Sequence, residues 1–140
     1  MDSRELLFRG QTRKRGEKVN MAGEPLAGIW VYGGIFQGKG DRSVIYTYDP
    51  VDKFPVYNET VGQCIGIPDR NGVKIFDGDI VRHYNRPDEP DRYSQGVVFW
   101  DNTRLEWRRT GQGDETWKMK PGCIYEVIGN IYDTPELMEG

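Results

Sequence analysis

The sequence has few of the side chains that catalytic and metal sites most often use. Its 140 residues include one histidine and two cysteines. A structural zinc site draws four Cys or His ligands at short spacings, which this chain cannot supply. Small exported domains carry a denser set of cysteines that pair as disulfides. We therefore expect Cys64 and Cys123 to be reduced thiols, and the protein to stay in the cytoplasm where it is made.

Long apolar runs are also absent. No stretch approaches the roughly 18 apolar residues of a membrane-spanning helix, and Met1–Glu5 lacks the apolar core of a signal peptide. The mean hydropathy is -0.72, and the formal net charge of -3 produces no overall field that would attract nucleic acid. We expect no association with membranes.

Aromatic residues, glycine and proline are plentiful. The chain holds 8 Tyr, 5 Phe, 4 Trp, 18 Gly and 8 Pro. The glycines and prolines separate short aromatic and β-branched runs, and no stretch keeps helical periodicity for three turns. This pattern predicts a mainly β fold, with strands over residues 5–11, 28–36, 43–48, 61–67, 73–76, 80–84, 96–100, 105–107 and 124–132.

Turn signals suggest how these strands are organised. Asp49–Pro55 contains two prolines, so we expect it to interrupt the strands. We accordingly predict one domain over residues 1–140, with a β-rich amino-terminal lobe over 1–55 and a second lobe over 56–140. Asn71–Gly72 suits a two-residue hairpin turn, and Asp77–Gly78–Asp79 suits a second tight turn. Five short strands with intervening glycines predict that the second lobe is a small SH3-like β-barrel.

Three sequence blocks occur in order along nearly the whole chain. The first pairs an apolar-Phe-Arg-Gly start with a Trp-Val-Tyr-Gly strand, the second contains Asp-Arg-Asn-Gly and Phe-Asp-Gly-Asp-Ile-Val, and the third ends in Gly-Asn-Ile-Tyr. They are Leu6–Gly10 with Gly28–Gly33, Val61–Val81, and Tyr125–Leu137. Together they resemble the YopX family of bacteriophage and prophage proteins. The resemblance implies a β-rich fold with a barrel-like carboxy-terminal lobe, and it supplies no agreed catalytic residue.

One group of carboxylates could support chemistry. Asp69, Asp77 and Asp79 lie in two neighbouring turns, and His83 follows in the next strand. Such a group could hold a divalent ion for a metal-assisted hydrolase. The same aspartates suit tight turns, in which Asp accepts hydrogen bonds from backbone N–H groups, and we expect this role rather than a metal site. Since no nucleophile and base stand in a recognisable pattern, we expect no catalytic residue, no cofactor and no enzyme activity.

A basic and aromatic stretch offers a different site. Residues 104–120 hold five cationic and three acidic residues beside two tryptophans. Small β domains bind single strands by stacking bases on exposed aromatics next to cations. The candidate nucleic-acid residues are Arg104, Trp107, Arg108, Arg109, Trp117 and Lys118. The alternative is that the tryptophans belong to the core and the cations are ordinary surface residues.

These observations favour an interaction protein over an enzyme. We expect a phage or prophage accessory protein of the bacterial cytoplasm, a β-barrel module that self-associates as a homo-oligomer or binds a protein partner. Exposed edge strands of small β lobes favour such pairing. Nucleic-acid binding is the alternative, and metal-assisted hydrolysis is the second alternative.

Overall fold

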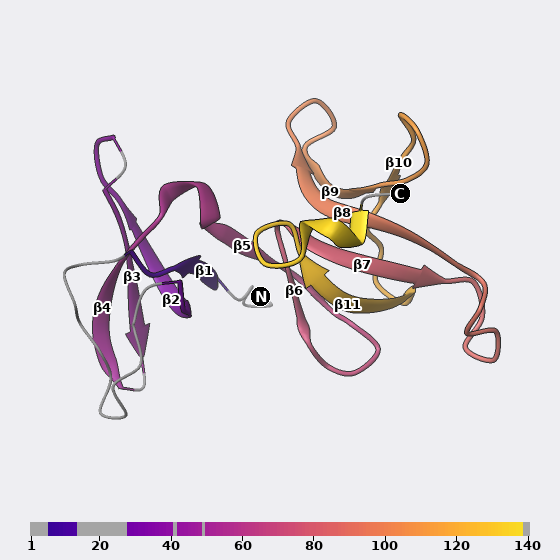
Figure 1. Ribbon diagram of the computed structural model, residues 1–140, viewed down its shortest axis with the longest axis horizontal. Helices are drawn as coiled ribbons and strands as arrows, with labels where there is room; N and C mark the ends of the chain where they lie inside the picture. The colour runs from indigo at the N-terminus through magenta and orange to yellow at the C-terminus, as the bar shows by residue number, and fades with distance from the viewer. Residues whose placement is uncertain (1–5, 14–27, 41, 49, 139–140) are drawn as a thin grey trace, which may run out of the picture. The chain divides into compact units, whose positions relative to one another are not determined.

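The computed structural model describes residues 6–13, 28–40, 42–48 and 50–138. These residues form antiparallel sheets and contain no α-helix (Figure 1). The chain divides into two compact units, one up to Gln63 and one from Cys64 onward. Accordingly no described helix has the length and hydropathy of a membrane crossing. The predicted β class is confirmed.

The first unit is built on a sheet with the strand order β4-β3-β2-β1-β5. Every neighbouring pair is antiparallel, and β5 continues into the second unit, where it pairs with β6. Thr12, just after β1, forms a bridge with Val56 at the end of β4, so the sheet curls around the buried Ile45 and Val56. Its elements are β1 (Phe8–Gln11), β2 (Trp30–Gln37), β3 (Ser43–Tyr48), β4 (Val51–Val56), the 3-10 turn η1 (Asn58–Thr60) and β5 (Gly62–Pro68).

The segment that was expected to interrupt the strands is itself strand β4. Pro55 is accommodated because β4 is an edge strand. The Pro55 carbonyl points away from β3 and accepts a hydrogen bond from the Arg13 N–H at 3.0 Å. The substituted nitrogen of Pro55 faces the same way, so β3 loses no donor. Proline is tolerated on such an outer edge, where no ladder hydrogen bond is lost. The prediction overlooked this exception and therefore missed β4.

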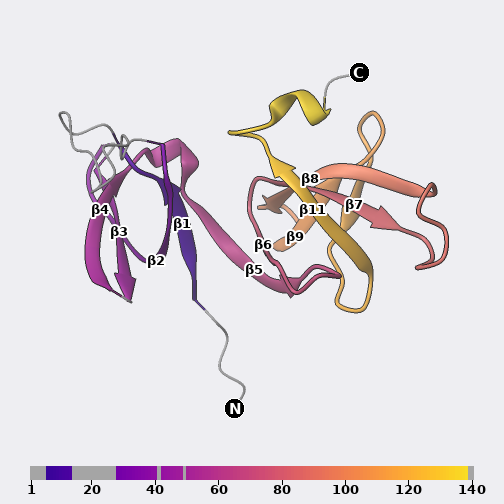
Figure 2. The same cartoon turned by 60° about the horizontal axis from the view of Figure 1, so that its bottom comes forward.

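The second unit contains a five-stranded sheet with the order β10-β9-β8-β7-β11. Its strand β11 leads into the 3-10 turn η2 (Figure 2). The unit's remaining elements are β6 (Lys74–Phe76), β7 (Asp79–Tyr84), β8 (Tyr93–Asp101), β9 (Glu106–Thr110), β10 (Thr116–Lys118), β11 (Ile124–Asn130) and η2 (Pro135–Met138).

The predicted closed SH3-like barrel is wrong for the described residues. The sheet ends in β10 on one side and β11 on the other, and these two strands do not pair. The three-residue β10 is too short to continue the ladder, while the Asp69–Gly72 turn occupies the far side of β11. There the Arg70 N–H donates to the Tyr125 carbonyl at 2.8 Å. The unit is an open sheet with a hairpin against one edge.

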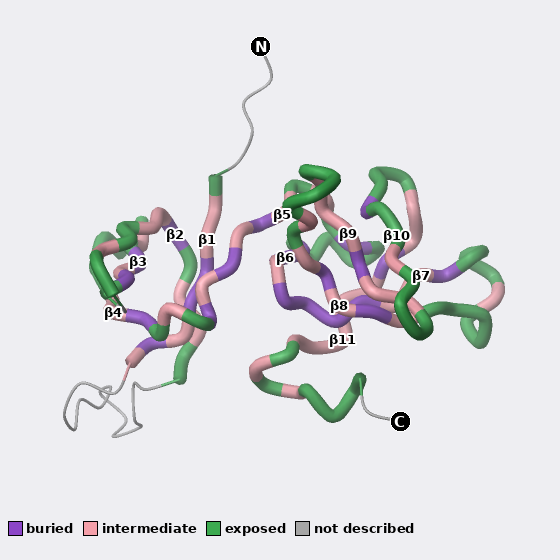
Figure 3. The backbone as a smooth tube through the Cα atoms, turned by 90° about the horizontal axis from the view of Figure 1, so that it is seen from above, coloured by how far each residue is buried: buried purple, intermediate pink, exposed green. Residues whose placement is uncertain are grey.

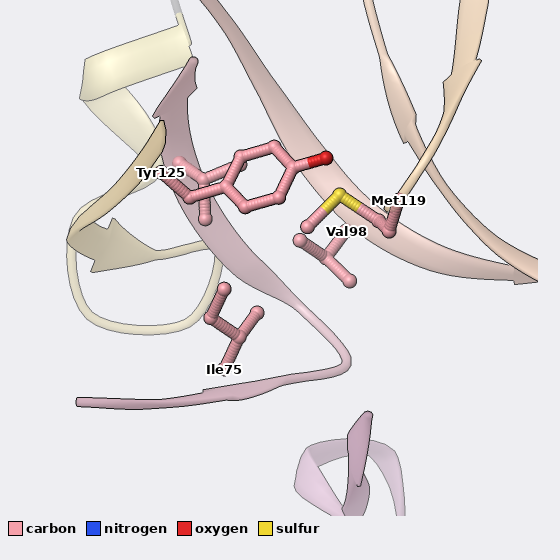
Figure 4. Close-up of a cluster of buried hydrophobic side chains, with 5 residues drawn as sticks. Ile75, Val98, Met119 and Tyr125 are labelled. Atoms are coloured by element: carbon pink, nitrogen blue, oxygen red, sulfur yellow. The ribbon is translucent and has the colours of Figure 1, made fainter. Parts of the chain in front are cut away.

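One face of this sheet carries the core of the second unit. Val81, Val98 and Tyr125 point from three strands toward Ile75 and Met119, and all five are at most 4% exposed. Figure 4 shows Ile75, Val98 and Met119 gathered on one side of the Tyr125 ring. In this unit the buried stretches lie in β6 and at the start of β7, and the exposed stretches lie mainly in the turns (Figure 3).

The carboxylate of Asp69 joins the hairpin turn to the sheet. Its Oδ1 accepts hydrogen bonds from the N–H groups of Asn71 and Val73, both at 2.8 Å, and its Oδ2 accepts one from the Val127 N–H at 3.0 Å. Gly72 completes the turn at φ 80°, a conformation that side chains resist. Because Asp69 is only 7% exposed, no water replaces these bonds if the carboxylate is lost.

Asp69→Ala should lower the free energy of unfolding by about 3 kcal/mol, because it leaves buried N–H groups without an acceptor. Asp69→Asn should cost less, since its oxygen can keep both turn bonds while its NH2 group faces the Val127 N–H. The exposed Asp88→Ala serves as the control and should change stability by less than about 0.5 kcal/mol. Urea denaturation measures all three. An Asp69→Ala variant as stable as Asp88→Ala would contradict this role.

Leu105 is the single non-glycine residue with positive φ among those described, at φ 55°. It ends the turn between β8 and β9, in which its N–H donates to the Asp101 carbonyl at 2.7 Å. The side chain is 71% exposed, so it adds little to the core. The sequence places a leucine where asparagine or glycine would be less strained.

Leu105→Asn should therefore raise the free energy of unfolding by about 1 kcal/mol, since asparagine tolerates the left-handed conformation. Leu105→Val is the control with the opposite expected effect. A β-branched side chain fits this conformation worse than leucine, so the Leu105→Val variant should be less stable than the wild type. Thermal unfolding followed by circular dichroism orders the three proteins. If asparagine proves no better than leucine, the strain assigned to this turn is not there.

Candidate functional site

The alternation of side chains along a strand divides the candidate nucleic-acid-binding residues between the two faces of one sheet. In β9, Trp107 and Arg109 pair with Trp100 and Val98 of β8, on the face that bears the core. Arg108 pairs with Phe99 and so lies on the opposite face. In β10, Trp117 pairs with Arg109, and Lys118 pairs with Arg108. The six residues therefore do not form one surface.

Several of these side chains have structural partners. Trp107 packs against the core and meets Trp100 edge-on, with ring centroids 5.2 Å apart. Arg108 forms an ion pair with Glu106 at 2.7 Å and donates to the Thr116 hydroxyl and carbonyl at 2.9 and 2.7 Å. Arg104 pairs with Asp101 at 2.9 Å. Trp117 and Lys118 remain exposed. Nucleic-acid binding by this stretch stays a prediction.

The predicted carboxylate group is used in turns. Asp79 is 2% exposed and accepts a hydrogen bond from the Phe76 N–H at 2.8 Å, and Asp69 accepts the three backbone bonds described above. Gly78, between Asp77 and Asp79, has φ 90°. No set of three or more His, Cys, Asp or Glu side chains among the described residues is placed to hold a metal ion. The arrangement fits the alternative reading, in which these aspartates cap tight turns.

His83 instead belongs to a polar cluster beside the core. Arg109, which is 3% exposed, donates through Nη2 to His83 Nδ1 at 3.0 Å and to the Ser94 hydroxyl at 2.7 Å. Its Nη1 donates to the Thr110 carbonyl at 3.2 Å. The imidazole lies 5.0 Å from the Tyr125 ring. A guanidinium can only donate, so Nδ1 must be unprotonated and the proton of neutral His83 is on Nε2.

The electrostatics of the cluster follow from burial of a cation. Burial first, and then the Arg109 charge, lower the pKa of His83 below its ordinary value. Burial also lowers the pKa of Arg109, although an arginine stays charged. Burial raises the pKa of Tyr125, whose hydroxyl accepts from the Lys120 N–H at 3.0 Å. The cluster therefore contains one charge, on Arg109, surrounded by neutral groups.

The first unit presents a second candidate surface, which the sequence interpretation missed. Tyr32 and Phe36 of β2 lie on the same face as Gly34, which pairs with Tyr46 of β3. Tyr48 extends that face along β3, and its hydroxyl lies over Gly34, 3.4 Å from where a Cβ would stand. We call these four aromatics the aromatic face. They are 46%, 58%, 46% and 66% exposed, in the order Tyr32, Phe36, Tyr46 and Tyr48.

The alternation of aromatic with aliphatic residues along β2 and β3 is the sequence signal that could have predicted the aromatic face. Ile35, Ile45 and Phe54 are paired across three strands on the other side of the sheet, and Ile45 is fully buried. The aromatics at the intervening positions must then point outward. On this sheet the aliphatic Ile45 lies on the core side, and the aromatics of the aromatic face lie on the outer side.

The pKa of His83 predicts a specific dependence of stability on pH. Because the folded-state pKa is below the unfolded-state value of about 6.5, the unfolded chain binds the proton more readily, and stability falls as pH drops through that value. The wild type should therefore be less stable at pH 5.5 than at pH 7.5.

His83→Asn provides the control for this dependence, because asparagine does not titrate and its oxygen can accept from Arg109 in place of Nδ1. Urea denaturation at the two pH values should show a smaller loss for His83→Asn than for the wild type. Equal losses in both proteins would mean that the ring is not held neutral by Arg109.

Three comparisons relate the chain to known proteins. A putative beta-glucuronidase of Formosa agariphila is 31% identical over 71 residues, a match that covers 47% of this chain and 8% of that protein. The crystal structure of protein EF1440 from Enterococcus faecalis is 28% identical, with a TM-score of 0.40 and 76% of each chain covered. The family model described as YopX protein matches residues 34–139. The chain therefore belongs to the YopX family.

Proposed function

We propose that this YopX family protein is a non-enzymatic phage or prophage accessory protein that self-associates through its aromatic face. The observation that supports this is the gathering of Tyr32, Phe36, Tyr46 and Tyr48 on one face of the β2–β3 sheet, each at least 46% exposed. Tyrosine and phenylalanine are enriched in protein interfaces and dominate their binding energy.

The aromatic face is better suited to protein than to nucleic acid. Lys53 is the cation that β4 contributes beside it, where it pairs with Tyr46, and the acidic Asp52 precedes it. Over residues 28–56 the sequence holds three cationic and three acidic side chains. A nucleic-acid surface needs an excess of cations to replace the counterions of the phosphates. A balanced, aromatic surface lacks that attraction and favours contact with another apolar surface.

The neighbouring sheet edge does not provide the contact. The Lys53 N–H of β4 donates to the Asp52 carboxylate at 2.8 Å, and Pro55 has no N–H to offer. Capped donors and proline are the features by which edge strands avoid pairing with other chains. Edge-strand addition, the route to association expected from the sequence, is therefore disfavoured for β4. For this sheet we therefore propose that self-association uses the aromatic face and not the β4 edge.

The size of the aromatic face sets the expected strength of the contact. An aromatic side chain can bury roughly 150–250 Å², so four half-exposed ones offer roughly 400 Å² per chain. Val51, 84% exposed and paired with Tyr48, enlarges it. Two copies that meet face to face would bury roughly 1,000 Å² in total, at the lower end of specific interfaces. We therefore expect a dimer that forms in the micromolar range.

Sedimentation over a concentration series tests the proposal. Between about 5 and 200 µM, the average mass of the wild type should rise from the 16.1 kDa monomer toward the dimer. Tyr46→Thr combined with Tyr48→Thr keeps β propensity but removes both rings, and it should weaken association at least about tenfold.

Val73→Thr is the matched control, because Val73 is 49% exposed and lies in the second unit. It should associate as the wild type does. A wild type that stays monomeric throughout the series would refute self-association, and a double variant that dimerises normally would show that the contact lies elsewhere.

A further inference from the structure

The buried Arg109 differs from the arginine beside it in having no acidic partner. Arg108 forms an ion pair with Glu106, whereas the side-chain hydrogen bonds of Arg109 go to the neutral acceptors His83, Ser94 and Thr110. No carboxylate of the described residues lies within ion-pair distance of Arg109. Removing a cation from water without a counter-charge is costly, and neutral hydrogen bonds recover only part of that cost.

The contacts of Arg109 leave two neighbouring groups able to donate. The Ser94 oxygen accepts from Arg109, so the hydroxyl hydrogen is free to bond to something else. His83 accepts through Nδ1, so its Nε2 carries a hydrogen. Ser94 is exposed and His83 is partly exposed, which gives a ligand access to donors next to the buried charge.

An exposed aromatic ring flanks the same group. Trp117 is the cross-strand partner of Arg109 and is 52% exposed. Its indole lies over Gly111, where a Cβ would come within 2.8 Å of the indole nitrogen. A side chain at position 111 would therefore displace Trp117 from its place beside Arg109. The sheet face thus brings together a cation, a hydroxyl, an imidazole and an open aromatic surface.

From this geometry we propose that Arg109, Ser94 and His83 form a binding site for a phosphate group, either free or carried by a nucleotide. Both Nη2 hydrogens of Arg109 are already donated to His83 and Ser94, so the Ser94 hydroxyl donates to the anion and the guanidinium beside it supplies the positive charge. A phosphate carries a charge of about −1.5 to −2, more than a carboxylate, and is favoured for that reason. The anion supplies the counter-charge that Arg109 lacks. In the nucleotide case Trp117 stacks on the base. The site lies in the second unit and is independent of the aromatic face.

The single histidine of the chain makes the site directly observable. In the full-length protein at constant pH and ionic strength, inorganic phosphate should shift the ring proton signals of His83 in a saturable way, with a dissociation constant of about 1 mM. Acetate and chloride at the same ionic strength should not. No saturable shift with phosphate, or equal shifts with all three anions, would overturn the proposal.

Variants separate binding from folding. Ser94→Ala, at an exposed position, should weaken phosphate binding about tenfold, and Arg109→Lys about a hundredfold. Arg86→Ala removes an exposed cation outside the candidate residues and is the control that should bind as the wild type does. If Arg109→Lys fails to fold, Ser94→Ala alone decides the matter. Unchanged affinity in Ser94→Ala would refute the site.

The source of the phosphate group is settled by a second ligand. Adenosine monophosphate that binds about tenfold more tightly than inorganic phosphate, and loses this advantage in Trp117→Ala, identifies a nucleotide site. Equal affinities for the two ligands identify a site for free phosphate. Adenosine monophosphate that binds without competing with inorganic phosphate would contradict a shared site.

Discussion

The carboxylate of Asp69 is the interaction on which the second unit depends. It bonds its own hairpin turn through one oxygen and the Val127 N–H of β11 through the other. The hairpin is thereby held beside β11, and Ile75 of β6 covers the open sheet. Tyr125 is packed in the core that results, and its hydroxyl fixes the Lys120 backbone that follows Met119. The ring of Tyr125 packs against His83, so the position of the polar cluster also depends on Asp69.

Adjacent arginines in β9 show how a sheet gives two identical side chains different roles. Arg108 faces carboxylates of its own unit and is neutralised by them. Arg109 faces the core and meets only neutral acceptors. The first arrangement stabilises the strand pairing of β9 and β10, since Arg108 also bonds Thr116. The second keeps a charge in a site of low polarity, which is more usual of binding sites than of cores.

The features that could be predicted from the sequence are those that depend on neighbouring residues along the chain. The strands other than β4 and β10, and the Asn71–Gly72 turn, follow from alternation and turn chemistry. The sequence could not show that Pro55 lies on an outer edge, because that depends on which strands are neighbours. Nor could it show which side of β9 faces inward, so Arg109 was grouped with surface cations. Ser94 was placed in a loop because β8 begins earlier than its apolar residues do.

The account of function depends on the aromatic face, which is exposed although it consists of residues that usually seek burial. Hydroxyl-radical footprinting at low and high protein concentration tests it most directly. The account predicts that Phe36, Tyr46 and Tyr48 become protected at high concentration while Leu105 and Trp117 do not change. Protection confined to residues of the second unit, or none at any concentration, would contradict it.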